Sequence, residues 1–257
     1  MCSRTFAPPP NAVASRVERA PARWLADPAK QQLLLIAFWP LTALVLWCDS
    51  RAVGAGGALG QWVADGMAAL FLAALVWGLP TERRVLALLF VPISAVGEGV
   101  FSLLFGLYRY RLGGVPLYVP CGHAILLVIG LLLADGEWVQ RRVAQVRIGL
   151  LLFHGGLIGG ALLLYGDTLS AIFGLGFAAI LVRKRGRPFY LIMGVLVLYI
   201  ELLGTAWGCW TWTAQPWGVL HTTNPPTGAF ACYVVADLIA MRLTRRLLRA
   251  PTRPAGG

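Results

Sequence analysis

The sequence predicts an all-α protein, a polytopic integral membrane bundle of about eight transmembrane helices. Of the 257 residues, 58% are hydrophobic and only 13% are charged, whereas soluble domains carry about 25% charged residues. Apolar runs of about 20 residues recur along the chain, which is the length that a helix needs to cross a bilayer. No segment shows the period-2 alternation of an outer-membrane barrel.

The apolar runs divide the chain into eight expected spans separated by short polar or basic connections. We expect them at 33–48, 59–79, 85–107, 115–134, 148–165, 168–182, 188–207 and 227–240. The sixth is short enough to need flanking residues or local thinning of the bilayer. Residues 135–147 are expected to form a charged linker, and 208–226 a long uncharged loop.

The basic residues predict the orientation of this bundle. With the N-terminus inside, all but three of the 22 Lys and Arg residues fall in the inner segments, the exceptions being Arg51, Arg109 and Arg111. Because cytoplasmic loops carry the excess of Lys and Arg, we expect an inner (plasma) membrane protein with both termini in the cytoplasm. Residues 1–30 and 249–257 are expected to be basic cytoplasmic tails, flanking a transmembrane domain at 31–248.

Composition also argues against several kinds of partner. The net charge of +11 lies in short loops and forms no continuous basic face, so we predict no nucleic-acid binding. Five Cys residues without CxxC spacing favour neither a zinc cluster nor a disulfide framework. Cys121 and Cys209 both fall toward the outer side, where a disulfide is chemically allowed but has no geometric support. No Walker or Rossmann glycine pattern is present, and we predict no cofactor.

Two segments about a hundred residues apart share a pattern. In each, a Glu inside an apolar segment precedes Gly-x-aromatic-x-aromatic and then Pro-x-Gly. The first copy comprises Glu98, Gly106-x-Tyr108-x-Tyr110 and Pro120-x-Gly122, and the second Glu201, Gly208-x-Trp210-x-Trp212 and Pro226-x-Gly228. This similarity predicts an internal duplication of four plus four spans, with halves at about 31–135 and 147–248 in parallel orientation.

The candidate catalytic residues are Glu98, Glu201, His123 and His154. Each Glu is expected about 15 Å below the outer end of its span, where a carboxylate is costly and usually faces the bundle interior. We expect the four side chains to form either an acid–base site or a proton path. A metal site is less favoured, because the sequence has no HxxxH or ExxH spacing. The plainer alternative is that each makes a hydrogen bond between helices.

The outer loops carry the candidate substrate-binding residues, which are Tyr108, Arg109, Tyr110, Trp210, Trp212 and Asn224. The functional interpretation is a lid over a portal for a lipophilic substrate. The alternative is an ordinary aromatic belt at the membrane interface. The repeated Gly-aromatic-x-aromatic pattern favours the functional interpretation modestly.

Glu98 followed by Gly-x-Tyr-x-Tyr and then by Val115-Pro116 and Val119-Pro120 resembles the membrane-embedded carotenoid hydratase family of the bacterioruberin pathway. The resemblance covers 98–124 and 207–230. It implies the addition of water across a terminal isoprenoid double bond, which needs a proton donor and no redox cofactor, with Glu98 and Glu201 as the acid candidates. The sequence departs from the family pattern in having His123 inside the fourth span and no clear Gly-Trp after Asn224.

Three functions remain open at this point. The first is an intramembrane enzyme that uses Glu/His acid–base chemistry on an isoprenoid-like or lipid substrate, with membrane lipids and a lipophilic small molecule as partners. The second is a proton- or cation-coupled transporter that uses the same carboxylates. The third is a scaffold or assembly protein, which the absence of a ligand-sized cavity would favour.

Overall fold

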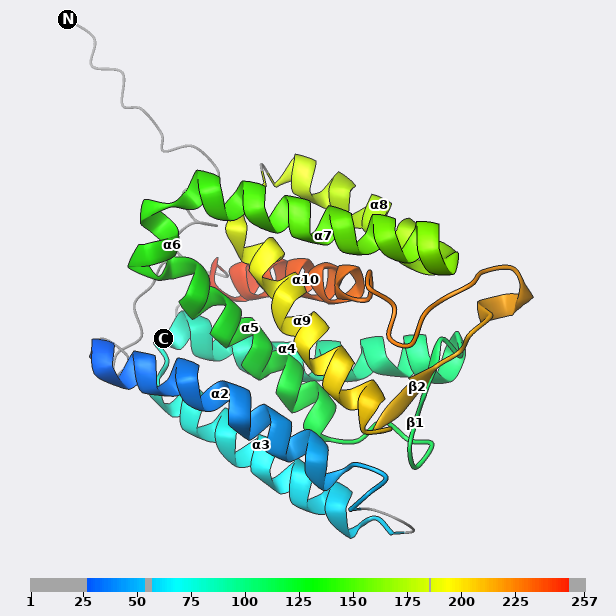
Figure 1. Ribbon diagram of the computed structural model, residues 1–257. Helices are drawn as coiled ribbons and strands as arrows, with labels where there is room; N and C mark the ends of the chain where they lie inside the picture. The colour runs from blue at the N-terminus through cyan, green and yellow to red at the C-terminus, as the bar shows by residue number, and fades with distance from the viewer. Residues whose placement is uncertain (1–26, 54–56, 185, 250–257) are drawn as a thin grey trace, which may run out of the picture.

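The computed structural model describes residues 27–53, 57–184 and 186–249, and the chain is built almost entirely of helices (Figure 1). The longer helices are α2 (Pro28–Cys48), α3 (Leu59–Gly78), α4 (Thr81–Glu98), α5 (Tyr118–Asp135), α7 (Val143–Tyr165), α8 (Thr168–Arg183), α9 (Pro188–Ala206) and α10 (Phe230–Arg249). The short elements are the π-helical turn η1 (Gly99–Leu104), β1 (Tyr108–Tyr110), α6 (Glu137–Arg141), β2 (Trp210–Trp212) and the 3-10 turn η2 (Pro216–Gly218).

All eight expected apolar segments are helical, but within the described residues six helices are long and apolar enough to cross a membrane. These are α2, α3, α4 with its η1 extension, α5, α7 and α9. Helix α8 has 16 residues, below the length of an ordinary span. Helix α10 has 20 residues but carries Asp237 and several Arg residues, which lower its hydropathy. The fold is therefore an all-helical bundle compatible with a multi-pass membrane protein.

The centre of the bundle is formed by α5 and α9. Of the apolar window of α5, 83% is buried, compared with 11% for α7. Helix α5 is apolar around its whole circumference, as a helix surrounded by others must be, and it packs against α2, α3, α4 and α9. Its first turn is held by Asp65 of α3, whose carboxylate accepts the backbone N–H of Tyr118 at 2.7 Å.

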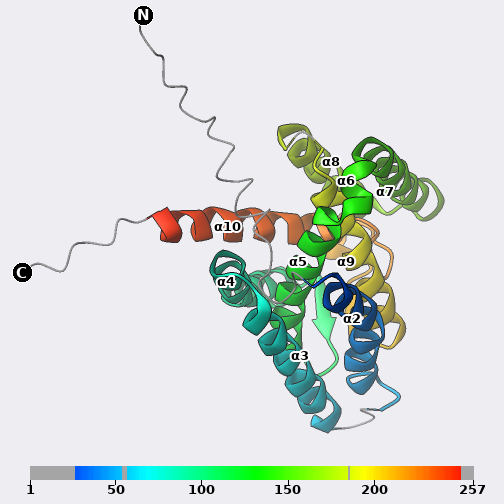
Figure 2. The same cartoon turned by 90° about the vertical axis from the view of Figure 1, so that its left-hand side faces the viewer.

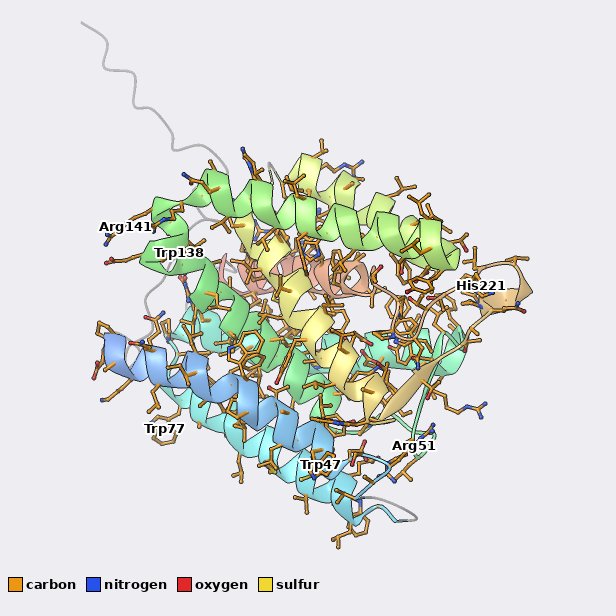
Figure 3. The ribbon with its side chains drawn as sticks, viewed as in Figure 1. Trp47, Arg51, Trp77, Trp138, Arg141 and His221 are labelled. Atoms are coloured by element: carbon orange, nitrogen blue, oxygen red, sulfur yellow. The ribbon has the colours of Figure 1, made fainter. Side chains whose placement is uncertain are left out.

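The outer helices present large apolar side chains on the surface. Trp77 of α3 is 86% exposed and Leu163 of α7 is 84% exposed, and Figure 3 shows Trp77 pointing away from the bundle. Such faces suit acyl chains. The glycines of α7 lie in open space, because a Cβ at Gly155, Gly156, Gly159 or Gly160 would meet nothing within 4 Å. Within this chain they form no close helix–helix contact.

Two connections contain more regular structure than the sequence indicated. The segment expected to be a charged linker at 135–147 contains α6 and the first turn of α7. The segment expected to be a loop at 208–226 contains β2 and η2. The tails expected at 1–30 and 249–257 lie outside the described residues, apart from 27–30, where α2 begins, and residue 249, where α10 ends. Viewed as in Figure 2, the C-terminal end of α10 projects beyond the neighbouring helices.

Helices from the two parts of the chain are interleaved. Helix α4 packs on α10, and α9 packs on α5, so each of these pairs joins an early helix to a late one. Strands β1 and β2 pair with each other at one end of the bundle, opposite α6 (Figure 1). We refer to this as the sheet end, and the candidate site lies just beneath it.

Candidate functional site

The two strands form an antiparallel pair in which Tyr108 lies opposite Trp212 and Tyr110 opposite Trp210. A glycine with positive φ precedes each strand, Gly106 at 63° and Gly208 at 70°. Only glycine adopts this backbone conformation without strain, so these residues allow the chain to turn from helix into strand. The shared Gly-x-aromatic-x-aromatic pattern thus corresponds to one turn geometry used in both segments.

All four aromatic rings of the pair point to the same side. Successive side chains of a strand alternate between faces, so Tyr108 and Tyr110 are buried while Arg109 between them is exposed. The same holds for Trp210 and Trp212. The rings of Tyr108 and Trp212 pack with centroids 4.6 Å apart. The aromatic residues therefore form a continuous ceiling above the helices, which a belt of lipid-facing rings would not do.

Glu98, the last residue of α4, lies beneath this ceiling and is 6% exposed. Its Oε2 accepts the hydroxyl groups of Tyr108 and Tyr110, each at 2.5 Å. The π-helical turn η1 begins at the next residue, and π-helical turns are frequent at functional sites. Because both hydroxyls occupy Oε2, the Oε1 atom is the oxygen of Glu98 that remains available for chemistry.

Glu201 of α9 is bound in an equivalent way by the other strand. Its Oε2 accepts the indole N–H of Trp210 at 2.9 Å and that of Trp212 at 3.0 Å, and its Oε1 accepts the hydroxyl of Tyr233 at 3.1 Å. An indole N–H can only donate, so Oε2 is fixed as an acceptor. Any proton carried by Glu201 must therefore be on Oε1, on the side of Tyr233.

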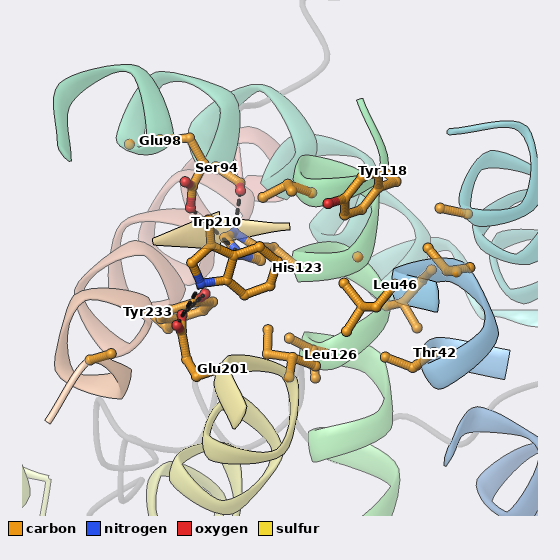
Figure 4. Close-up of a pocket in the computed structure, with 18 of the residues that line it drawn as sticks. Thr42, Leu46, Ser94, Glu98, Tyr118, His123, Leu126, Glu201, Trp210 and Tyr233 are labelled. Atoms are coloured by element: carbon orange, nitrogen blue, oxygen red, sulfur yellow. Dashed lines mark hydrogen bonds and ion pairs between the residues drawn. The ribbon is translucent and has the colours of Figure 1, made fainter. Parts of the chain in front are cut away.

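His123 of α5 completes the cluster next to Glu98. Its Nε2 lies 3.6 Å from Glu98 Oε1, and its Nδ1 is 2.5 Å from the hydroxyl of Ser94. The imidazole ring packs against Tyr233 with centroids 4.4 Å apart. Figure 4 shows Glu98 and Glu201 on opposite sides of the site with Trp210 between them. The imidazole and the carboxyl are thus close enough to exchange a proton after a small movement.

These groups form the polar end of one cavity with a volume of about 100 Å³; its wider outline, open mouth included, encloses about 1080 Å³. The rest of the lining is mostly apolar and comes mainly from α2 and α5, including Phe38, Leu46 and Leu126. A cavity of this kind, apolar with a few converging polar groups, is typical of small-molecule sites. Among the described residues no group of His, Cys, Asp and Glu could hold a metal ion.

The structure brings together most of the candidate residues but not all. Glu98, Glu201, His123, Tyr108, Tyr110, Trp210 and Trp212 line the cavity. His154 does not: its Nε2 is bound to the carbonyl of Leu191 at 2.9 Å, and its ring packs on Phe230. Asn224 supports the ceiling from outside, since its Oδ1 accepts the backbone N–H of Trp212 at 3.1 Å.

Two parts of the site were missed from the sequence. Tyr233 has no counterpart in the repeated pattern, because the residue at the same offset from Pro120-x-Gly122 is Leu127. The second part is a support beside the ceiling, where Asp49 accepts the guanidinium of Arg111 at 2.6 Å and the hydroxyl of Tyr118 at 2.8 Å. The sequence offered one signal for each part: a Tyr within an apolar segment for Tyr233, and Asp and Arg residues at the ends of spans for the support.

The described cysteines Cys48, Cys121, Cys209 and Cys232 are free thiols. Cys209 is fully buried and donates its S–H to the carbonyl of Leu46 at 3.2 Å. Burial, and next the charge of Asp49, raise the pKa of this thiol to about 12. Cys209 therefore packs as a neutral side chain beneath the support.

The phenols of the ceiling give the protein an alkaline limit. Burial, and next the nearby Glu98, raise the pKa values of Tyr108 and Tyr110 well above 10. A raised folded-state pKa contributes stability that is fully present below the unfolded value of about 10 and is lost as the pH rises above it. The free energy of unfolding, measured between about pH 9 and 11, should fall more steeply for the wild type than for Tyr108→Phe/Tyr110→Phe. Equal slopes would contradict this account.

Asp237 of α10 lies outside the cavity lining and has an unusual environment. It is fully buried, and neither carboxyl oxygen has a hydrogen-bond partner. A buried polar group without a partner costs about 1–3 kcal/mol, so Asp237→Leu, which has similar volume, should raise the free energy of unfolding by about that amount.

Asp167 provides the matched control for this substitution. It is also fully buried, but it accepts hydrogen bonds from the backbone and hydroxyl groups of both Ser170 and Thr223. Asp167→Leu should therefore lower stability, by about 2 kcal/mol or more. The two substitutions, compared in one denaturation assay, should have opposite signs, and a loss of stability in Asp237→Leu would show that this carboxyl has a structural partner.

The fold and the site together define a class: a helical protein compatible with several membrane crossings, holding two buried, hydrogen-bonded carboxyls at the head of an apolar cavity. Three comparisons with known proteins gave no match, either to a family model, among curated proteins or among solved structures.

Proposed function

We propose that the protein is an intramembrane enzyme that performs acid–base chemistry on a lipophilic, isoprenoid-like substrate. The observation that supports this most directly is the placement of Glu98 and Glu201 in one cavity whose remaining lining is mostly apolar. An apolar lining suits the uncharged end of a hydrocarbon chain, which would lie between the two carboxyls. With both termini in the cytoplasm, the sheet end faces the outer side of the membrane.

The reaction that suits this geometry is the addition of water to a terminal isoprenoid double bond. Glu98 donates a proton from Oε1 to the CH carbon of the terminal –CH=C(CH3)2 group, which leaves a tertiary carbocation on the dimethyl carbon. A water oxygen bonds to the cationic carbon and its proton passes to Oε1 of Glu201, beside Tyr233. Glu201 then passes this proton through the hydroxyl of Tyr233 to His123, whose ring packs on Tyr233, and His123, 3.6 Å from Glu98 Oε1, returns it to Glu98. The net product is a tertiary alcohol, and His154 has no role.

The roles differ because the surroundings of the two carboxyls differ. Only Glu98 has an imidazole beside it, which provides a route for reprotonation. Only Glu201 has a hydroxyl group, that of Tyr233, bound to its Oε1 atom, and this hydroxyl can relay a proton from water. Two matching arrangements support a shared origin for the two halves of the chain. Each Glu lies under donors from the strand that follows it, and α4 packs on α10 as α9 packs on α5. We infer that the two halves are related repeats.

The test uses the purified protein in nanodiscs with a panel of neutral polyprenes that end in an isoprene unit. Mass spectrometry detects the product by the addition of one water. Glu98→Gln and Glu201→Gln should each reduce turnover by about 10²–10⁴-fold, which is the usual contribution of a general acid or base. Glu137→Gln, the same change at an exposed residue, should leave turnover unchanged. Wild-type turnover in both cavity variants would remove the assignment.

A proton- or cation-coupled transporter is the second candidate, and Asp237 is the observation that favours it. Asp237 lies four residues after Tyr233 on α10, so the two are neighbours on one helix face. An unpartnered carboxyl below Glu201 could accept a proton that leaves the cavity. Uptake driven by a pH gradient in proteoliposomes, abolished by Asp237→Asn, would favour this function over the enzyme.

A further inference from the structure

We propose that the cavity is selective for amphiphiles whose head carries a positive charge, such as a protonated or quaternary amine, and that it excludes anionic heads. This inference rests on the proposed function in that it takes the same cavity as the substrate site. It adds the class of ligand that the cavity prefers, including molecules that undergo no reaction.

The charges of the lining are the first argument. The lining contains two carboxyl groups, Glu98 and Glu201, and one imidazole, His123. No Lys or Arg side chain from the described part of the chain lines it. An anionic head such as a phosphate would meet two acidic groups without a basic partner, and buried charges require a partner of opposite sign. A cationic head would supply the charge that the lining lacks.

The hydrogen bonds of the carboxyls are the second argument. The tyrosine hydroxyls and indole N–H groups of the two strands all bind Oε2, and the hydroxyl of Tyr233 donates to Oε1 of Glu201. They stabilise negative charge without neutralising it, because none of these donors is a cation. The Oε1 atoms of Glu98 and Glu201, beside His123 and Tyr233, remain the acceptors nearest to a ligand head.

The aromatic ceiling is the third argument. Tyr108, Tyr110, Trp210 and Trp212 all line the same cavity from one face of the sheet. A cation over the face of Trp or Tyr is attracted by the ring electrons, and quaternary ammonium groups are recognised in this way. The rings and the two carboxyl groups together form a cage for a positive charge, and Figure 4 shows Trp210 between Glu98 and Glu201.

The apolar part of the cavity determines the rest of the ligand. Below the polar head the lining consists of side chains such as Phe38, Val45 and Leu126, which suit a hydrocarbon tail. The same preference would favour the proposed enzymatic reaction. Protonation of the double bond forms a carbocation, and its positive charge would lie at the place in the cavity where the ammonium nitrogen of a ligand binds.

Three probes with one geranyl tail test the inference. They are geranyltrimethylammonium, its neutral isostere with carbon in place of nitrogen, and geranyl phosphate. Saturable binding to the full-length protein is measured by calorimetry in phosphatidylcholine nanodiscs, with empty nanodiscs as the control for partition into lipid. The ammonium should bind at least about tenfold more tightly than the neutral isostere, and the phosphate should show no saturable binding.

Two variants identify the source of this selectivity. In Glu98→Gln/Glu201→Gln the preference for the ammonium should fall below about twofold, while the neutral isostere binds as before. In Glu137→Gln the preference should be unchanged. Equal binding of the ammonium and its isostere in the wild type, saturable binding of the phosphate, or a preference that persists in the double variant would each overturn the inference.

The outcomes also separate this inference from the proposed function. Selective ammonium binding without turnover of any polyprene would refute the enzyme and leave the cation site in place. Turnover of polyprenes without ammonium selectivity would refute the cation site and leave the enzyme.

Discussion

Replacing Asp49 with Ala should lower the free energy of unfolding by about 3–5 kcal/mol. Asp49 and Arg111 form an ion pair in which both side chains are nearly enclosed, 1% and 8% exposed respectively. Arg111 donates from both Nε and Nη2 to the carboxylate, and Tyr118 donates to its other oxygen. Removal of the carboxylate leaves a buried guanidinium without its counter-charge, and the desolvation of that charge is then not offset. Denaturant unfolding in detergent micelles measures the change.

The ion pair between Glu137 and Arg141 is the matched control, because its side chains are 83% and 72% exposed. Glu137→Ala should cost less than about 1 kcal/mol. A second control is Asp49→Leu/Arg111→Met, which removes both charges and should be less destabilising than Asp49→Ala. If Asp49→Ala cost no more than Glu137→Ala, the support beside the ceiling would not be a major source of stability.

Gly204→Ala should destabilise the protein by about 3 kcal/mol and disturb Glu201 at the same time. Gly204 is on α9, one turn beyond Glu201, and the six-membered ring of Trp210 lies directly on it. A Cβ at this position would overlap the ring atoms Cη2, Cζ2 and Cζ3. The indole must then move, and its N–H loses the 2.9 Å hydrogen bond to Glu201. Both stability and turnover should therefore decrease.

A double-mutant cycle isolates this contact. In the background of Trp210→Ala the ring is absent, so the further change Gly204→Ala should cost less than about 1 kcal/mol, a coupling of about 2 kcal/mol. Gly176→Ala is the control for the substitution itself, since a Cβ there meets nothing within 4 Å and alanine is the better helix former. Additive losses from Gly204→Ala and Trp210→Ala would show that the two residues do not depend on each other.

The sequence was sufficient to predict the helical bundle and the main acidic residues. Apolar segments of about 20 residues are unambiguous in a chain with so few charges, and all eight were found as helices. Glu98 and Glu201 stood out because a carboxyl within such a segment is rare. His123, named with Glu98 as a candidate catalytic residue, lies 3.6 Å from it.

The sequence could not show how the remaining groups are arranged, because this depends on contacts between distant segments. Each strand has three residues, too few for a period-2 pattern, so neither their pairing nor the inward direction of the four rings was predictable. His154 was named because it lies within an apolar segment, but α7 packs on α8 and α9, and no residue of α7 lines the cavity. The apolar length of 227–240 predicted a span but not the polar character of the helix that follows.

The two strand donors for each carboxyl lie close to it in the chain, although the third donor to Glu201, Tyr233, is 32 residues away, and this has a consequence for biosynthesis. Glu98 is 10 and 12 residues from its two tyrosines, and Glu201 is 9 and 11 residues from its two tryptophans. Each acid can thus obtain its two strand donors as soon as the ribosome has released one short loop. The first half of the nascent protein can enter the bilayer with Glu98 already solvated by its own loop, before the second half has been translated.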